Sequence, residues 1–180
     1  MTAANCARSL KLVGLSEGGY TNHRLDRGSW YGGDLVGTNH GISAPVLADW
    51  RRRTPTRHQM MALTKTEADR IYKEKYWDSV RGDYLPRGLD YAMFDYGVNS
   101  GPSQAIKALQ RVIGAKPDGL FGAQTSKAIK RQNTEIIILS LMNRRLSFLQ
   151  RLKSWRTFGK GWARRVNRVR EDALKMAMER

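Results

Sequence analysis

A single acidic residue, Glu17, stands where an apolar helical pattern ends. From Thr2 to Leu15, apolar residues recur at three- and four-residue spacing, which predicts a helix with one buried face. Gly18 and Gly19 end this pattern, so Glu17 falls in the last turn, beside unpaired carbonyls and the negative end of the helix dipole. This position, with partial desolvation, would raise the carboxyl pKa and suit a proton donor to a leaving-group oxygen. The alternative is a helix-end acid exposed to water.

Further motifs follow Glu17 in a fixed order. Asp26 lies nine positions after it, and Thr38-Asn39-His40-Gly41-Ile42-Ser43 comes next. With Glu-Gly-Gly-Tyr-x-Asn at the start, these motifs resemble glycoside hydrolase family 108, the lysozyme-like N-acetylmuramidases of phages and Gram-negative bacteria. Four later segments are similar to the predicted peptidoglycan-binding part of that family: Asp95–Pro102, Ala108-Leu109-Gln110, Pro117–Gly122 and Phe158–Trp162. The resemblance covers roughly residues 7 to 165.

The resemblance implies a mainly α, lysozyme-like α+β fold with one small β-hairpin after the catalytic helix. It implies a catalytic lobe at 1–88 and a helical peptidoglycan-binding lobe at 89–180, packed together as one compact unit. The implied activity is cleavage of the β-1,4 bond between N-acetylmuramic acid and N-acetylglucosamine, with no cofactor. The implied partners are the glycan strands and stem peptides of peptidoglycan, and the expected state is a monomer.

Catalysis of this kind needs an acid and a second group that stabilises or captures charge at the anomeric carbon. The resemblance implies Glu17 as the acid, with Asp26 and the Thr38 hydroxyl in the second role. The family places its threonine about five residues after the aspartate, whereas Thr38 lies twelve after Asp26, so some seven residues are inserted. A lengthened, glycine-rich hairpin favours a roomy site and inversion by water. The alternative roles are turn capping for Asp26 and strand-end or helix capping for Thr38.

The candidate substrate-binding residues are polar or aromatic side chains near these groups. Seven are predicted: Tyr20, Asn22, Trp30, Asn39, His40, Tyr96 and Asn99. The first five could hydrogen-bond or stack on amide-bearing sugars, with Trp30 and Tyr31 as a movable lip. The last two flank Gly97, which allows close approach of a ligand. Helix-end capping and packing are the alternative roles for Tyr96 and Asn99.

Composition excludes several function classes. The 180 residues are 41% hydrophobic, with one cysteine, so an internal disulfide and a multi-cysteine metal site are excluded. No HExxH spacing links the three histidines, so no metal is expected. No apolar run is long enough to span a membrane, and the N-terminus does not resemble a signal peptide. The chain is therefore expected to accumulate in the cytoplasm and to reach the cell wall through a holin-type or other export route.

Charge is distributed unevenly along the chain. The net charge is +16, and residues 1–50 hold four basic and four acidic residues, so all of the excess lies in the rest. A basic second half suggests an anionic polymer as partner. A second hypothesis is therefore a non-catalytic basic module that binds the cell wall or nucleic acid. The intact Glu17 and the neutral first 50 residues favour the enzyme and disfavour nucleic acid.

Periodicity and capping signals predict the elements that would position these residues. Glycine turns predict one hairpin, at 30–36. Helices are expected at 2–15, 44–50, 65–76, 89–96, 102–113, 123–155 with a bend, and 162–178.

Overall fold

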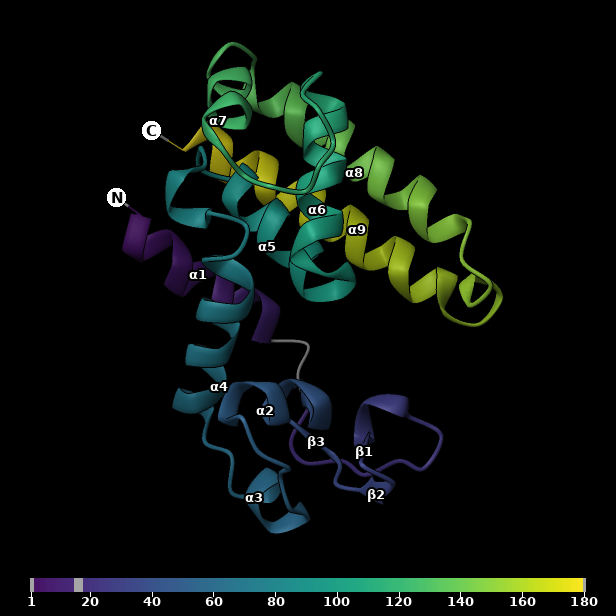
Figure 1. Cartoon of the computed structure of the whole chain (residues 1–180). Coiled ribbons are helices and arrows are strands. Elements are labelled where there is room, and N and C mark those ends of the chain that lie inside the picture. The colour runs from purple at the N-terminus through teal and green to yellow at the C-terminus, as the bar shows by residue number, and fades with distance from the viewer. Residues whose placement is uncertain (1, 15–17, 180) are drawn as a thin grey trace. The chain divides into compact units, whose positions relative to one another are not determined.

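The computed structural model describes residues 2–14 and 18–179, and these form two compact units (Figure 1). The hairpin unit is Leu10–Glu74, and the helical unit is Met1–Ser9 together with Lys75–Arg180. The chain passes between them inside α1 (Thr2–Gly14) and again inside the π-helical turn η2 (Lys73–Trp77). These units have other bounds than the predicted lobes. The catalytic role of 1–88 and the peptidoglycan-binding role of 89–180 stay predictions.

Two short antiparallel hairpins form the centre of the hairpin unit. Their strands are β1 (Trp30–Tyr31) with β2 (Asp34–Leu35), and β3 (Thr38–Asn39) with β4 (Ile42–Ser43). Each hairpin turns on two residues with positive φ: Gly32 and Gly33 in the first, His40 and Gly41 in the second. Two such residues make the turn whose twist matches paired strands. The first hairpin confirms the prediction at 30–36, and the second was not predicted.

Three helices pack beside these hairpins: α2 (Ala44–Arg51), α3 (Arg57–Met61) and α4 (Lys65–Tyr72). Arg51 at the end of α2 makes a two-pronged ion pair with Glu67 in the first turn of α4, with nitrogen–oxygen distances of 2.9 and 2.7 Å. Helix α3 replaces part of the loop expected after residue 50. It begins with a capping box, in which Thr56 and Gln59 each satisfy the other's backbone N–H.

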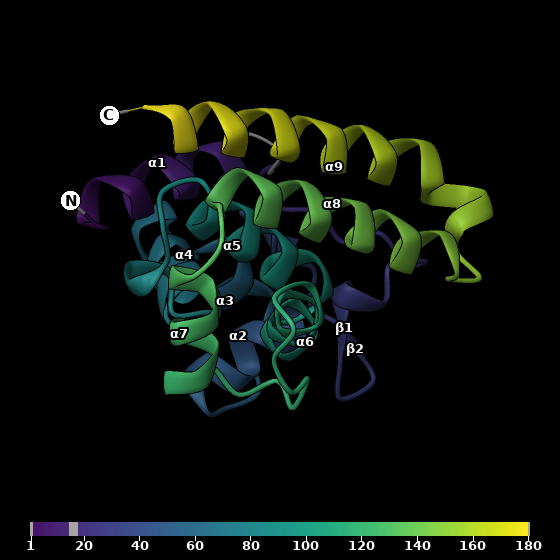
Figure 2. The ribbon, with the colours of Figure 1, turned by 90° about the horizontal axis from the view of Figure 1, so that it is seen from above.

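The helical unit is built around α5 (Leu89–Ser100), because residues 89–97 are all buried. Helices α6 (Pro102–Val112), α8 (Thr134–Gln150) and α9 (Trp155–Met178) surround it. Helices α8 and α9 lie side by side in both views (Figures 1 and 2). The short elements η3 (Gly82–Tyr84) and α7 (Ala123–Lys130) complete the unit. A helix that is buried on every side lies at the centre of a bundle, and α5 is such a helix even though it includes Asp90 and Asp95.

A buried ion cluster joins three of these helices. Asp95 of α5 accepts hydrogen bonds from Arg145 of α8 at 2.7 Å and from Arg165 of α9 at 2.9 to 3.2 Å. Burial by itself would raise the pKa of Asp95, but the two guanidinium groups outweigh that effect and hold the pKa below its usual value. The cluster therefore fixes the mutual positions of α5, α8 and α9 through a charged carboxylate.

Helix boundaries differ from the predictions at four places. Helix α5 continues past Gly97 to Ser100, and the expected long helix at 123–155 is two helices, because Asn133 caps a new start at Thr134. Helix α4 ends at Tyr72 and continues as a π-helical turn to Trp77. Helix α9 begins at Trp155 rather than at 162. The mainly α-helical prediction is confirmed.

Candidate active site

The predicted acid, Glu17, lies outside the described residues, so the site is built from the residues that follow it. Thr21 pairs with Thr38 through two backbone hydrogen bonds of 2.8 and 2.7 Å. This bridge fastens the segment directly after Glu17 to the first residue of β3. The same bridge uses the backbone of Thr38 and leaves its side chain half-buried.

The first predicted substrate residue, Tyr20, is held firmly beside this bridge. Its hydroxyl donates to the carbonyl of Val36 at 3.1 Å and accepts from Nε of Arg57 at 3.1 Å. Gly37 has φ +95°, and a Cβ there would lie 2.5 Å from the Tyr20 ring and 2.7 Å from the Thr21 carbonyl oxygen. Only glycine permits this approach of chain to ring. Tyr20 therefore fixes the local backbone whether or not it touches substrate.

Asp26 caps the short helical turn η1 (Arg27–Ser29). Its Oδ1 accepts from the Gly28 backbone N–H at 2.9 Å, and its Oδ2 accepts from the Ser29 hydroxyl at 3.0 Å. The alternative role, turn capping, is thus present in the structure. Asp26 is also exposed, so each oxygen retains room for a further contact.

The structure joins the Asp26 turn to Thr38. The carbonyl of Ser29, at the end of that turn, accepts from the N–H of Gly37 at 2.8 Å, and Gly37 directly precedes Thr38. The hairpin β1–β2 projects between these two ends. The hairpin β1–β2 therefore takes up the extra residues between Asp26 and Thr38. The Ser29–Gly37 hydrogen bond at its base keeps the backbone next to Asp26 joined to the backbone next to Thr38.

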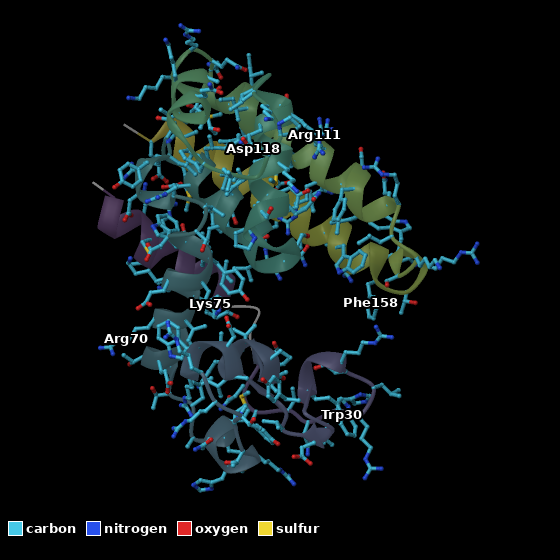
Figure 3. The ribbon with its side chains drawn as sticks, in the orientation of Figure 1. Trp30, Arg70, Lys75, Arg111, Asp118 and Phe158 are labelled. Atoms are coloured by element: carbon cyan, nitrogen blue, oxygen red, sulfur yellow. The ribbon has the colours of Figure 1, made fainter. Side chains whose placement is uncertain are left out.

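Trp30 begins the projecting hairpin. Its indole is 38% exposed, and its Nε1–H donates to the Arg24 carbonyl at 2.8 Å. That bond anchors the indole to the loop before Asp26 (Figure 3 labels Trp30). An amphipathic ring held by its polar edge with its face accessible is suited to stacking on a sugar.

Asn39 is buried and cross-links the unit. Its side-chain nitrogen donates to the carbonyls of Met60, Met61 and Leu63 at 2.9, 3.2 and 3.5 Å. These bonds tie β3 to the end of α3, a structural role that sequence reasoning missed. His40 and Asn22 are half-buried, and the His40 carbonyl accepts from the Tyr72 hydroxyl at 3.3 Å.

The other two predicted substrate residues belong to α5 of the helical unit. Tyr96 is fully buried, with the guanidinium of Arg145 over its ring at 5.1 Å from the centroid. Burial raises the pKa of the Tyr96 hydroxyl, and Gln104 and nearby arginines lower it in part. Asn99 accepts from the Ser100 hydroxyl at 3.2 Å near the helix end. These contacts give Tyr96 a packing role and Asn99 a helix-end role, which are the alternatives named above. Substrate binding by either residue stays a prediction.

Among the residues described, neither a metal site nor a membrane-spanning helix is found. No three His, Cys, Asp or Glu side chains there come together as a metal site. Within the same residues, no helix has the length and apolarity needed to cross a membrane. The described site thus offers an exposed carboxylate, a hydroxyl and aromatic side chains, a set suited to recognition and acid–base work on a sugar polymer.

Comparison with known proteins also points to a protein that acts on a sugar polymer. The family described as Glycosyl hydrolase 108 matches residues 10–101, which hold Glu17, Asp26 and Thr38. The chain is 41% identical to the protein in a solved structure titled "Structure of Brucella abortus SagA", with a TM-score of 0.89 over 98% of each chain. No curated protein sequence matches the chain.

The chain therefore belongs to glycosyl hydrolase family 108. The predicted resemblance and the predicted lysozyme-like α+β fold are both confirmed. Membership makes the chain a glycoside hydrolase of the lysozyme-like, peptidoglycan-cleaving kind.

Proposed function

We propose that the chain is an endo-acting N-acetylmuramidase that cleaves the β-1,4 bond between N-acetylmuramic acid and N-acetylglucosamine. Glu17 is the general acid that protonates the departing oxygen. The observation that carries the proposal is the family match over residues 10–101, which contain Glu17 and the motifs that follow it in order. The enzyme works on the cell wall, which it reaches by export, in phage release or in opening the wall for secretion.

The described backbone supports a shared site for the proposed groups. Thr21, which follows Glu17 by four positions in the sequence, is bonded to Thr38. The Asp26 turn is bonded through Ser29 and Gly37 to the same strand. Asp26 and the Thr38 hydroxyl then position the attacking water, which gives inversion of the anomeric carbon.

The proposed subsites follow from the contacts of the neighbouring side chains. Trp30 presents an anchored indole face to a sugar ring, and Asn22 and His40 present half-buried polar groups from neighbouring segments. The helical lobe 89–180 holds the polymer through its positive charge.

A zymogram with purified cell walls tests the proposal. Wild-type protein should clear a band and Glu17→Gln should not, because loss of a general acid typically costs about 10² to 10⁴ in rate. Glu74→Gln, a neutralised acid at the exposed end of the same unit, is the matched control and should clear like wild type. Normal clearing by Glu17→Gln would refute Glu17 as the acid. Binding of DNA without wall lysis by the wild type would select the basic binding module instead.

A further inference from the structure

The segment from the end of α2 to the start of α3 holds four arginines and no acidic residue: Arg51, Arg52, Arg53 and Arg57. Arg51 is neutralised by its two-pronged ion pair with Glu67. Arg57 is also held in place, but by a neutral group, because its Nε donates to the Tyr20 hydroxyl at 3.1 Å. None of the ion pairs found among the described residues includes Arg57. Its position is therefore fixed while its charge is left unpaired there.

The backbone at Arg57 is held firmly beside β3. Arg57 is the first residue of α3, whose start is fastened by the capping box of Thr56 and Gln59. Helix α3 packs against β3, and the Asn39 side chain of that strand donates to the Met60 carbonyl at 2.9 Å (Figure 1). Arg57 therefore projects from a rigid part of the hairpin unit, packed against the strand that holds a predicted catalytic hydroxyl.

The guanidinium end of Arg57 lies against Tyr20, next to the candidate active site. Its central carbon is 5.9 Å from the centre of the Tyr20 ring, which adds a cation–π contact to the hydrogen bond from Nε. Tyr20 in turn donates to the Val36 carbonyl, and its neighbour Thr21 is bonded to Thr38. A single side chain, that of Tyr20, thus links Arg57 to the backbone of the site.

Two nitrogens of the Arg57 guanidinium remain available to a ligand. Nε is used by Tyr20, whereas no hydrogen bond from Nη1 or Nη2 is found within the part of the chain that the structure describes, and the side chain is exposed. A planar pair of such donors binds a carboxylate through two parallel hydrogen bonds. Because Tyr20 already orders the side chain, little rotamer freedom is lost when the carboxylate binds.

We propose that Arg57 is a specificity-determining residue that pairs with a carboxylate on the muramic acid substituent of the glycan strand. This substituent is a lactyl group, which is either a free carboxylate or the attachment point of an acidic stem peptide. Chitin has the same β-1,4 linkage but no acidic substituent, so Arg57 favours peptidoglycan over an uncharged glycan. The inference rests on the proposed function, because it names the feature of the substrate that the same site recognises.

Arg53 supplies a matched control for this role. It is an exposed arginine of the same segment, and its backbone N–H donates to the Ala48 carbonyl at 3.2 Å, a bond that a side-chain change leaves intact. Arg57→Gln and Arg53→Gln remove the same charge from the same segment, and only the first removes the cation that contacts Tyr20. Tyr20→Phe keeps the ring and removes the hydroxyl that orients Arg57.

Fluorescence anisotropy with labelled soluble glycan fragments on ice measures the Kd of the full chain. The fragments are used in two forms, with free stem-peptide carboxylates and with these carboxylates converted to methylamides, at a salt concentration that screens distant charges. Arg57→Gln should raise the Kd for the acidic form about tenfold, the loss expected for a charge-assisted pair, and leave the Kd for the methylamide form unchanged. Tyr20→Phe should show the same selectivity with a smaller rise. Arg53→Gln should change either Kd less than about twofold.

Fragments freed of their stem peptides distinguish the two sources of the carboxylate. An amidase removes the peptide and leaves a free lactyl carboxylate on the sugar. A tenfold effect of Arg57→Gln on these fragments assigns the pairing to the lactyl group, and an effect confined to the peptide-bearing fragments assigns it to the stem peptide.

Two outcomes would overturn the role of Arg57. One is an equal rise in Kd for the acidic and methylamide forms in Arg57→Gln, which would show that Arg57 only supports Tyr20. The other is an effect on the acidic form no larger than that of Arg53→Gln. Thermal unfolding checks that each variant is folded. Digestion by the wild type is scored separately at 37 °C, and selective binding without digestion would refute the proposed muramidase activity while the role of Arg57 stands.

Discussion

The hairpin unit and the helical unit each place an aspartate where chain segments meet, and they treat its carboxylate in opposite ways. Asp26 is exposed and accepts hydrogen bonds from its own turn, from Gly28 and Ser29. Asp95 is buried and accepts from Arg145 and Arg165, which lie 50 and 70 positions further along the chain. The first carboxylate is accessible to a substrate, and the second is sealed inside a bundle.

Charge follows the same division. The hairpin unit, residues 10–74, holds ten basic and seven acidic residues, a net +3, and the remaining residues therefore carry +13 of the total +16. The hairpin unit combines short strands, glycine turns and exposed polar groups, whereas the helical unit combines long helices with a buried ion cluster. The contrast is consistent with the proposal that the hairpin unit carries the chemistry and that the helical unit contributes stability and affinity for the polymer.

The largest effect expected from this contrast is the loss of stability in Asp95→Asn. The change leaves the Arg145 guanidinium fully buried without its counter-charge. Breaking a buried ion pair on one side costs about 3–5 kcal/mol. Urea unfolding at neutral pH should show a loss of this size, against less than about 1 kcal/mol for Asp26→Asn, since asparagine also caps turns well. Equal losses for the two variants would contradict the contrast.

For turnover, Asp26→Asn is expected to have a larger effect than Asp95→Asn. Asp26→Asn should lower the rate of cell-wall digestion by about 10², because an amide cannot act as a base toward the attacking water. Folding should stay normal, since the Oδ1 bond to Gly28 is kept. If Asp26→Asn keeps most activity, Asp34 on the projecting hairpin is the next carboxylate to change. NMR of the first product anomer checks the mechanism, and a β-anomer would mean retention rather than the proposed inversion.

Two glycines with positive φ in the hairpin unit, Gly33 and Gly37, allow a test of whether the position of Tyr20 matters for activity. Gly37→Ala and Gly33→Ala both place a side chain at φ near +90°, which costs about 1–2 kcal/mol. At Gly37 the new methyl group also meets the Tyr20 ring, whereas at Gly33 it meets nothing within 4 Å. Gly37→Ala should therefore lose activity as well as stability, and Gly33→Ala should lose stability alone. Similar digestion rates in the two variants would show that the position of Tyr20 does not matter to the site.

The sequence predicted the parts of the fold that depend on neighbours along the chain. Gly32-Gly33 marked the first hairpin, and the helix at 89–96 followed from its apolar residues at helical spacing, although the structure buries 89–97 on every side. The capping box of Thr56 and Gln59 could have revealed α3, because Thr64 and Glu67, at the same spacing, stand at the start of the helix that was predicted at 65–76. Helix α9 was expected to begin late because Gly159 and Gly161 weaken a helical pattern.

The partners of buried polar groups could not be predicted. Asp95 binds arginines that lie far away in sequence, and Asn39 binds carbonyls at the end of α3. Nothing in local spacing selects these partners, since folding alone brings them together. The candidate catalytic residues came from motif order. Tyr96 was assigned to the substrate side because the neighbouring Gly97 allows close approach of a ligand; the structure buries its ring under Arg145, and its substrate role stays a prediction.

The helical unit should also show two opposite pH effects on stability. Burial raises the pKa of Asp90, although bonds from Tyr91, Asn5 and Gly88 and the charge of Arg87 offset part of this effect. A raised carboxyl pKa gives stability that is present below the unfolded value, about 4, and is lost as pH rises through the folded value. The lowered pKa of Asp95 works the other way, so its contribution is present above about pH 4 and lost as pH falls below it.

Urea unfolding between pH 4 and pH 7 separates these two groups. Asp90→Asn removes only the first effect, so its free energy of unfolding relative to wild type should rise with pH. A tenfold difference between the acid dissociation constants of the folded and unfolded states corresponds to about 1.4 kcal/mol, which sets the scale of this rise. A difference between variant and wild type that stays constant over this range would show that Asp90 titrates normally in the folded chain.

The smallest expected effect is that of salt, and it separates affinity from chemistry between the two units. Salt screens charges over about 8 Å at physiological ionic strength, so binding to polyanionic cell wall through the +13 unit should weaken as salt rises. Turnover of a short soluble glycan fragment depends on the hairpin unit with its net +3, and it should change little over the same range. Co-sedimentation with sacculi and release of fragment ends, measured from 50 to 500 mM NaCl, give the two curves. If fragment turnover falls with salt as steeply as sacculus binding does, the basic charge acts on the chemical step itself. The reason is that a short fragment gains no affinity from the helical unit, so screening of that unit's charge should leave its turnover unchanged.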